Sequence, residues 1–338
     1  MKKPVRHCIN VSALLFCLLF ILPLATVTVI HREKAKNEQN PESVEILPPG
    51  KIDSDETVRV LTDKGVQKMS MSEYLQGVVR AEMPASFEEQ ALCAQAVTAR
   101  TYTLYKITTG SNHGTAADVC TDPTCCQAYS AKPAAMRNWG KNAAVYERKI
   151  ENAVAATDGE TILYNNQPIL AVFHSSSAGC TKGSGEVWTK DLPYLKSVSS
   201  PEKGKEIPNY YSRVSYTPAE FRKKFTAAQP QAKFSADVRS WIRGLQTTEG
   251  HNVKTVIIGG VRVSGTRVRS IFGLRSATFD PEIKDGKIIF YVTGYGHGVG
   301  MSQYGANELA KEGKSWREII CHYYTGVTLA CRTRRGAA

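Results

Sequence analysis

Apolar residues recur at helical spacing after three short polar patterns that are typical of helix starts. Ser70–Glu73 is a capping box, apolar residues follow it at helical spacing, and Pro84 predicts the end of that helix. A second capping box at Ser86–Glu89 predicts a helix that continues through Leu104. A third, Ser315–Glu318, predicts a helix near the C-terminus.

Runs typical of strands and further helical patterns fill the rest of the chain. The predicted strands are 58–61, 161–164, 169–174, 254–258, 267–271 and 287–292. The further predicted helices are 138–157, 218–225, 236–245 and 302–311. Because helices and strands come in blocks, without the regular alternation of a doubly wound sheet, the pattern predicts an α+β fold with mostly antiparallel sheets.

Residues 1–32 combine a long apolar run with basic residues on both sides. No charged residue occurs from Val11 to Ile30, and about 20 helical residues span a hydrocarbon core of about 30 Å. A cleaved signal peptide has a shorter apolar stretch, so we interpret residues 1–32 as an uncleaved signal-anchor that forms a single N-terminal transmembrane helix. The charges that precede the apolar run favour an orientation with the rest of the chain outside the membrane.

The remainder of the chain divides by composition. Residues 33–56 are polar, with prolines and acids in place of any periodicity, and predict a tether. Residues 57–331 would form one extracytoplasmic body, followed by a basic tail at 332–338. Such a location would permit a disulfide between Cys321 and Cys331, which their spacing alone does not establish.

The overall composition is that of a basic globular protein. Of 338 residues, 42% are hydrophobic and 22% charged, which excludes wholesale disorder. The net charge of +12 suits a polyanion such as nucleic acid, an anionic membrane surface or an anionic wall polymer. The chain has no arginine-rich helix and no long Lys/Arg block, so we do not expect it to bind nucleic acid.

Glu82 stands out among the acidic residues, because it lies where a predicted helix ends. The helix dipole disfavours an anion at that end, and apolar neighbours such as Val79 and Met83 could raise the pKa of a carboxyl group. A general acid needs such a raised pKa in order to hold its proton near neutral pH. Glu82 is therefore a candidate catalytic acid, and the alternative is a salt bridge to Arg80 or Arg100.

One imidazole and three thiols lie close together in the loop 113–127. His113, Cys120, Cys125 and Cys126 make a Cys₃His set suited to tetrahedral zinc. Adjacent cysteines rarely bind one ion together, so Cys125 is the weakest candidate and Asp118 a substitute for it. The alternatives are disulfides and free thiols. Four protein ligands would leave no open position on the metal, so the predicted zinc is structural.

Two further segments have the chemistry of a sugar-binding groove. The serine-rich turn 173–181 precedes Trp188, and its hydroxyl groups suit sugar oxygens, although most such turns are only turns. The glycine-rich segment 294–306 would present polar and aromatic side chains between a strand and a helix. Its alternative interpretation is a tight packing corner around His297.

Taken together, these segments resemble the family of stage II sporulation protein D, whose domains also occur in amidase enhancers. The segments in question are YLQGVVRAEMPASFEEQALCAQAVTARTY, HGTAADVCTDPTCCQAY, VFHSSSAGCTKGSGEVW with PYLKSV, SGTRVRSIFGLRSATF and GYGHGVGMSQYGANELAKEGKSWREIICHYYTGV. The resemblance covers residues 58–329, nearly the whole body.

The resemblance implies a lytic transglycosylase that cleaves the MurNAc–GlcNAc bonds of peptidoglycan glycan strands already stripped of stem peptides. One carboxyl group, here Glu82, protonates the glycosidic oxygen, and the C6 hydroxyl of the sugar attacks C1 to leave a 1,6-anhydro end. The candidate substrate-binding residues are Arg100, Ser176, Thr181, Tyr194, Lys196, Gln303 and Tyr304. The zinc loop of the family maps onto His113, Cys120 and Cys126, and Cys125 stands where a second histidine is expected.

The same resemblance implies a place and partners. The chain would act during engulfment of the forespore, between the mother-cell and forespore membranes, together with the sporulation amidase (stage II protein P) and the membrane protein M. The main alternative is a non-catalytic, glycan-binding enhancer of a cell-wall amidase. A zinc hydrolase is a second alternative, which a saturated Cys₃His site disfavours.

Overall fold

The computed structural model describes residues 48, 50–202, 204–248 and 250–332. The predicted signal-anchor, most of the tether and residues 333–338 of the tail lie outside this part of the chain. Within it, no helix is both long and apolar enough to cross a membrane.

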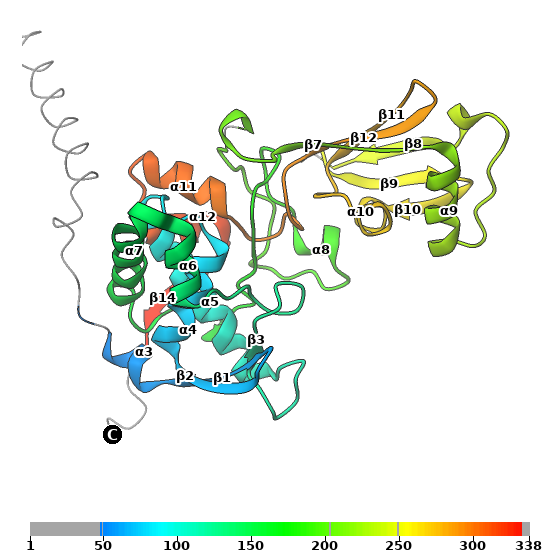
Figure 1. Cartoon of the computed structure of the whole chain (residues 1–338). Helices are drawn as coiled ribbons and strands as arrows, with labels where there is room; N and C mark the ends of the chain where they lie inside the picture. Colours follow the sequence, from blue (N-terminus) through cyan, green and yellow to red (C-terminus); the bar gives the residue numbers. More distant parts are fainter. Residues whose placement is uncertain (1–47, 49, 203, 249, 333–338) are drawn as a thin grey trace, which may run out of the picture.

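The described residues form two lobes, each with its own buried core (Figure 1). We call residues 50–202 and 294–332 the main lobe and residues 211–293 the inserted lobe. The sequence predicted a single body, because nothing in the hydrophobic pattern marks the points where the chain leaves one core for the other. Helices dominate the main lobe, whereas two small sheets and two helices build the inserted lobe.

In chain order the main lobe contains α3 (Lys51–Asp55), β1 (Thr57–Thr62), β2 (Gly65–Ser70), α4 (Met71–Glu82), α5 (Glu89–Thr109), β3 (Val119–Cys120), α6 (Lys132–Trp139), α7 (Ala143–Ala156), β4 (Glu160–Tyr164), β5 (Gln167–Pro168), β6 (Phe173–His174), α8 (Ser184–Val187), β13 (Met301–Ser302), α11 (Gln303–Lys311), α12 (Trp316–Tyr323) and β14 (Thr328–Cys331). The inserted lobe contains β7 (Tyr211–Tyr216), α9 (Pro218–Ala228), β8 (Ile242–Thr247), β9 (Val253–Ile258), β10 (Val261–Ser264), α10 (Gly265–Phe272), β11 (Phe279–Lys284) and β12 (Lys287–Thr293). Short 3₁₀ turns lie at Gly140–Asn142, Gly204–Glu206 and Val238–Ser240.

The sheets are mostly antiparallel, which confirms the predicted α+β class. Their strand orders are β2-β1-β3, β10-β9-β8, β11-β12-β7, β13-β6 and β14-β4-β5. Among the strands that the structure describes, the short pairings of β1 with β3 and of β13 with β6 are parallel.

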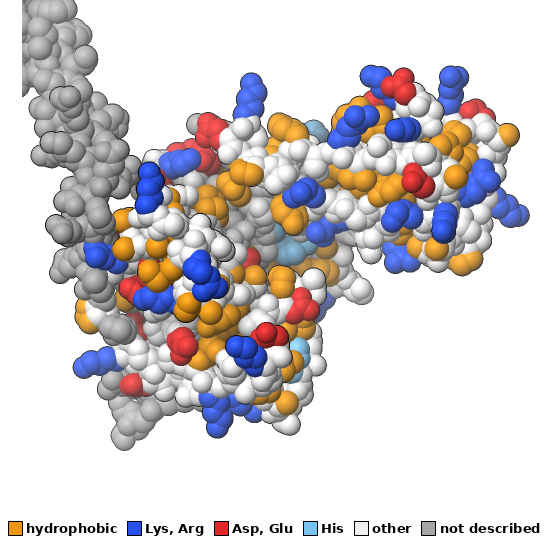
Figure 2. Space-filling model, viewed as in Figure 1, with side chains coloured by type: hydrophobic (Ala, Val, Ile, Leu, Met, Phe, Trp, Pro, Cys, Tyr) orange, Lys and Arg blue, Asp and Glu red, His pale blue; other side chains and the backbone are white. Residues whose placement is uncertain are grey.

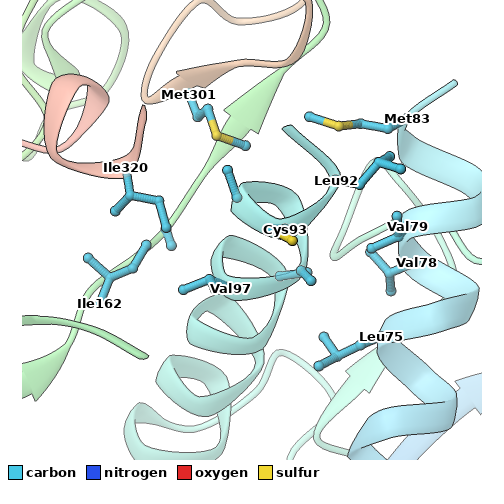
Figure 3. Packing of buried hydrophobic residues seen from close by; sticks show 14 of the residues in the cluster. Leu75, Val78, Val79, Met83, Leu92, Cys93, Val97, Ile162, Met301 and Ile320 are labelled. Atoms are coloured by element: carbon cyan, nitrogen blue, oxygen red, sulfur yellow. The ribbon is translucent and has the colours of Figure 1, made fainter. Parts of the chain in front are cut away.

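Helix α5 lies in the middle of the main-lobe core. Leu75 and Val78 of α4 lie on one side of α5, where Leu92 also lies (Figure 3). Val97 points to the opposite side, which residues from β4, β13 and α12 cover. A helix that is buried all round needs no amphipathic stripe. The packing of α4 against α5 therefore positions the C-terminal end of α4, where Glu82 lies.

Several predicted elements are confirmed, and others are wrong. Of the predicted strand 169–174, only the last two residues form a strand, β6. The predicted strand 267–271 is helix α10, because Ser264 caps its start and Gly273 ends it in the left-handed conformation. The predicted helix 236–245 becomes a 3₁₀ turn and strand β8, because the chain pairs with β9 there. The capping box at Ser86–Glu89 does not form, since the N-cap of α5 is Glu88.

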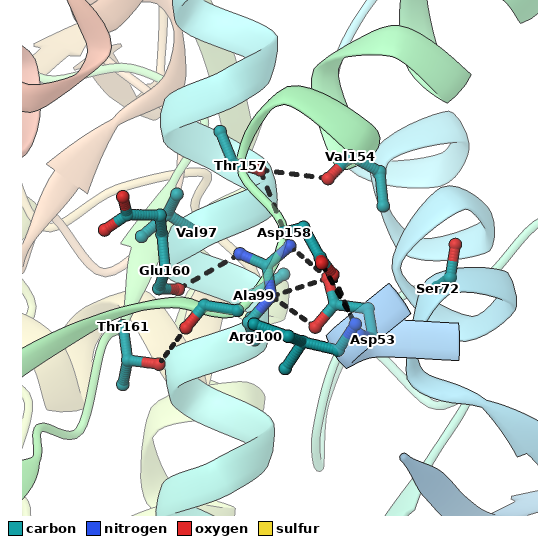
Figure 4. A network of polar contacts seen from close by, with 12 residues as sticks. Asp53, Ser72, Val97, Ala99, Arg100, Val154, Thr157, Asp158, Glu160 and Thr161 are labelled. Carbon is teal, nitrogen blue, oxygen red and sulfur yellow. Dashed lines mark hydrogen bonds and ion pairs between the residues drawn. The ribbon is translucent and has the colours of Figure 1, made fainter. Parts of the chain in front are cut away.

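The predicted tether ends earlier than residue 56, because helix α3 packs on the main lobe. The carboxylate of Asp158 accepts hydrogen bonds from the backbone N–H groups of Ile52 and Asp53, at 3.0 and 2.8 Å, and so caps the start of α3 (Figure 4). At the other end of the body, Arg332 pairs with Glu56 at 2.9 Å. The two ends of the described chain therefore lie together.

Candidate functional site

Glu82 is the last residue of α4, and its side chain is only partly exposed. The helix ends there because Pro84 follows, and the Met83 N–H makes the last helical hydrogen bond, to Val79. Two neutral donors contact the carboxylate. The backbone N–H of Ala128 donates to Oε1 at 2.7 Å, and the Gln303 carboxamide donates to Oε2 at 3.4 Å.

Burial raises the pKa of Glu82 above its ordinary value, although both hydrogen bonds act in the opposite direction. Neither ion pair considered for Glu82 exists. Arg80 pairs with Glu147, with distances of 2.5 and 2.9 Å, and Arg100 pairs with Asp53. Among the residues that the structure describes, no lysine or arginine forms an ion pair with Glu82. Its carboxyl group is therefore suited to hold a proton.

Gln303 and Tyr304 open helix α11, which Ser302 caps by accepting from the Gly305 N–H. Gln303 is buried and reaches Glu82, whereas Tyr304 packs edge-on against Phe87 with ring centroids 4.9 Å apart. The Tyr304 N–H donates to the carbonyl of Ser175 at 3.0 Å. Helix α11 thus joins the predicted serine-rich turn to the candidate acid.

Ser176 lies in that turn and exchanges two backbone hydrogen bonds with Tyr295, at 3.1 and 2.9 Å. Its side chain is 3% exposed, and its hydroxyl group has no hydrogen-bond partner within the described chain. The serine-rich and glycine-rich segments, far apart in sequence, therefore form one edge of the site.

The other three predicted groove residues of this region have mostly structural contacts. The Thr181 hydroxyl accepts from the Val198 N–H at 3.0 Å, and the Tyr194 hydroxyl accepts from the Leu170 N–H at 3.1 Å. Both side chains are buried, which leaves them little surface to offer a glycan. Lys196 alone is exposed, and it pairs with Asp191 at 3.0 Å.

Arg100 does not belong to the site. Its side chain is fully buried in the middle of α5, and its guanidinium group contacts the Asp53 carboxylate at 2.5 and 2.9 Å (Figure 4). The same group also donates to the Glu160 carbonyl at 3.1 Å. We therefore remove Arg100 from the candidate groove, because a buried and paired guanidinium cannot reach a substrate.

The structure brings together all four predicted metal ligands. One potential ligand atom from each of His113, Cys120, Cys125 and Cys126 lies within 4.8 Å of the others. The His113 Nε2 atom is 3.6 Å from the Cys125 sulfur and 3.8 Å from the Cys126 sulfur, and the two sulfurs are 3.9 Å apart. Asp118 pairs with Arg59 instead, at 2.6 Å.

These spacings suit one tetrahedral ion. With Zn–S near 2.3 Å and Zn–N near 2.0 Å, the edges of the tetrahedron are about 3.5–3.8 Å long. Each cysteine in the described chain is free, so no disulfide competes for the thiols, and Cys321 and Cys331 are not bridged. The donor set therefore fits zinc, and Cys125 fits as well as the other ligands.

The cysteine loop leads directly to the candidate acid. Gln127, between Cys126 and Ala128, is buried and donates to the hydroxyls of Tyr74 and Thr103, at 3.3 Å each. The next residue supplies the N–H group that binds Glu82. Sequence reasoning missed this contact, since a backbone donor leaves no mark on residue identity.

Comparisons with known proteins identify several relatives of this chain. A family described as "Stage II sporulation protein" matches residues 62–164, which include Glu82 and the cysteine loop. The chain is 37% identical to stage II sporulation protein D of Bacillus amyloliquefaciens, over 80% of this chain and 76% of that protein. It is 33% identical to stage II sporulation protein D of Bacillus subtilis, over 96% of both chains. It is 30% identical to the amidase enhancer of Bacillus subtilis, over 75% of this chain and 40% of that protein.

Proposed function

The chain belongs to the stage II sporulation protein D family, and from this premise we propose that it degrades the cell wall during sporulation, as a lytic transglycosylase. The substrate would be peptidoglycan glycan strands without stem peptides, cut between MurNAc and GlcNAc to leave 1,6-anhydro ends. The observation that supports this proposal best is a half-buried carboxyl group, Glu82, with neutral donors and no cation.

Glu82 would act first as an acid and then as a base. Its proton goes to the glycosidic oxygen while the C1–O bond breaks, and the leaving sugar departs as an alcohol. The resulting carboxylate then takes the proton of the C6 hydroxyl as that oxygen bonds to C1. Because the sugar supplies its own nucleophile, the second carboxylate of a hydrolase is not required. Ala128 and Gln303 would hold the carboxylate in the orientation that both steps need.

We propose that zinc, held by His113, Cys120, Cys125 and Cys126, is structural. Four protein ligands saturate a tetrahedral ion, so it would order the loop that positions Ala128 and would not contact the substrate. We also retain as proposals the membrane anchor at residues 1–32 and the extracytoplasmic body. Partnership with the sporulation amidase and the membrane protein M is a further proposal, and the relative named amidase enhancer supports an association with an amidase.

Substitution Glu82→Gln tests the reaction. The variant should bind peptide-stripped glycan as the wild type does, yet release no 1,6-anhydro ends detectable by mass spectrometry. Glu73→Gln, at an exposed position near the start of the same helix, is the matched control and should keep full activity. Anhydro ends from the Glu82→Gln protein, or none from the wild type, would favour the alternative, a glycan-binding enhancer of an amidase.

A further inference from the structure

Exposed tyrosines gather where the inserted lobe joins the main lobe. The exposed large hydrophobic side chains of the described chain are Val66, Leu245 and three tyrosines, Tyr211, Tyr291 and Tyr295. The three tyrosines are 67%, 40% and 44% exposed. A soluble surface has no structural need for such a group, so its concentration at one place indicates a binding surface.

Two of these tyrosines share one face of a sheet with a guanidinium group. Strands β7 and β12 pair antiparallel, with Arg213 opposite Tyr291 and Tyr211 opposite Thr293. Tyr211 and Tyr291 are therefore diagonal neighbours, with α-carbons about 7–8 Å apart. Side chains of both strands line a hollow of about 210 Å³. On the outer strand β11, Asp280 lies directly opposite Tyr291.

The third tyrosine links this face to the candidate site. Tyr295 exchanges backbone hydrogen bonds with Ser176, one residue from the carbonyl that accepts the Tyr304 N–H. The Arg275 guanidinium lies over the Tyr295 ring, 4.8 Å from its centre. Tyr211 and Tyr291 thus lie on paired strands, and Tyr295 lies on the segment that follows β12 and pairs with the serine-rich turn. We call Tyr211, Tyr291 and Tyr295, with Arg213 and Arg275, the tyrosine platform.

The inserted lobe is also strongly basic. Residues 211–293 contain fourteen lysines and arginines against six acidic residues, and so hold most of the net charge of +12. Figure 2 shows basic side chains spread over this lobe. A basic surface with exposed aromatic rings suits a polymer that combines apolar ring faces with regularly spaced negative charges.

We propose that the tyrosine platform is a second binding site for peptide-stripped glycan, outside the site around Glu82. This inference relies on the substrate class of the proposed function. Hydrolysis of the amide bond that joins a stem peptide to MurNAc leaves a free lactyl carboxylate, so a stripped strand has one negative charge per disaccharide. The tyrosine rings would lie against pyranose faces, and Arg213 and Arg275 would bind the freed carboxylates. The platform would thereby distinguish stripped strands from strands that still have peptides.

Binding is measured on the full chain with Glu82→Gln in every sample, so that no turnover occurs. The ligands are stripped glycan strands, the same strands with their carboxylates converted to methyl amides, neutral chitin oligosaccharides and anionic lipid vesicles. Tyr211→Ala with Tyr291→Ala should weaken binding of stripped glycan about tenfold or more, which corresponds to about 1.4 kcal/mol. Tyr211→Phe with Tyr291→Phe should restore binding, since the rings remain. Arg213→Ala should weaken binding of stripped glycan but not of the methyl-amidated strands.

Two control variants change matched residues elsewhere on the same lobe. Leu245→Ala removes another exposed hydrophobic side chain, and Arg262→Ala removes an exposed positive charge from a different sheet. Both should bind as the parent does. The proposal is overturned if the double alanine variant binds within twofold of Leu245→Ala, or if Arg262→Ala and Arg213→Ala are equally impaired, which would indicate diffuse charge. It is also overturned if the tyrosine variants lose affinity only for anionic lipid vesicles. Because no cleavage is measured, these outcomes remain separate from a failure of Glu82 as the acid.

Discussion

Replacing Asp53 by leucine should leave the Arg100 guanidinium buried without a counter-charge. The Arg100 and Asp53 side chains are 0% and 1% exposed, and after the substitution Arg100 keeps only the Glu160 carbonyl and the more distant Thr157 hydroxyl. Removing one partner of a buried ion pair costs about 3–5 kcal/mol. We expect a loss of this size in the free energy of unfolding, measured by urea denaturation.

Arg100→Met should lower the free energy of unfolding by a similar amount, because it leaves the Asp53 carboxylate buried without its ion-pair partner. The double variant should lose much less than the sum of the two, because apolar side chains of similar volume can replace a buried pair at little cost. A loss below about 1 kcal/mol for Asp53→Leu would refute the reasoning, since water would then reach Arg100. This double-mutant cycle also tests the removal of Arg100 from the candidate groove. If Arg100 bound glycan, the stable double variant would lose glycan binding, and we expect it to bind normally.

Three further variants or treatments test other parts of the structure. Chelation should lower the free energy of unfolding by about 4 kcal/mol relative to a sample with free zinc at 1,000 times its Kd. Cys126→Ser should abolish this zinc effect and Cys321→Ser should not; an unchanged melting temperature on chelation would contradict a structural metal. Lys182 is 4% exposed, and burial lowers its pKa from 10.5 to about 8. The buried charge therefore lowers the free energy of unfolding below pH 8 by about 3 kcal/mol, relative to its value above pH 10.5 where the amine is neutral. Lys182→Met should raise the free energy of unfolding by that amount at pH 7, and the difference from the wild type should disappear as the pH rises from 8 to 10.5. A difference that does not change with pH would argue against burial of a charge. Gln303→Leu removes a donor to the Glu82 carboxylate and should raise its pKa further, as followed by carbon-13 NMR titration, whereas an unchanged titration would show that Gln303 does not act on Glu82.

Local signals in the sequence predicted local structure well. Ser70 and Ser315 cap helices as expected, because a capping box involves only residues within one turn. Where an outcome depends on distant partners, the prediction failed. The segment 236–245 has the periodicity of a helix, yet pairing with β9 makes its second half part of strand β8. The separate core of the inserted lobe was equally invisible, because periodicity reports burial but not which core buries a residue.

The sequence predicted those parts of the candidate site that depend on the type of side chain, and not those that depend on backbone groups. Glu82 could be singled out because a carboxylate at a helix C-terminus has no local reason to be there. Arg100 was assigned to the groove from the family resemblance, and its true partner, Asp53, lay in a segment interpreted as a tether. The Ala128 contact could not be predicted at all, since any residue except proline offers the same N–H group.

Within the described part of the chain, no positively charged side chain forms an ion pair with Glu82. Arg80 and Arg100, which the sequence suggested as salt-bridge partners of Glu82, lie in the core helices. Each forms an ion pair with a carboxylate from another segment. A cation free to turn toward Glu82 would hold it ionised and remove its use as an acid. The two buried pairs therefore do more than join helices, because they keep positive charge away from the end of α4. Neutral donors remain there, and these can orient a carboxyl group without taking its proton.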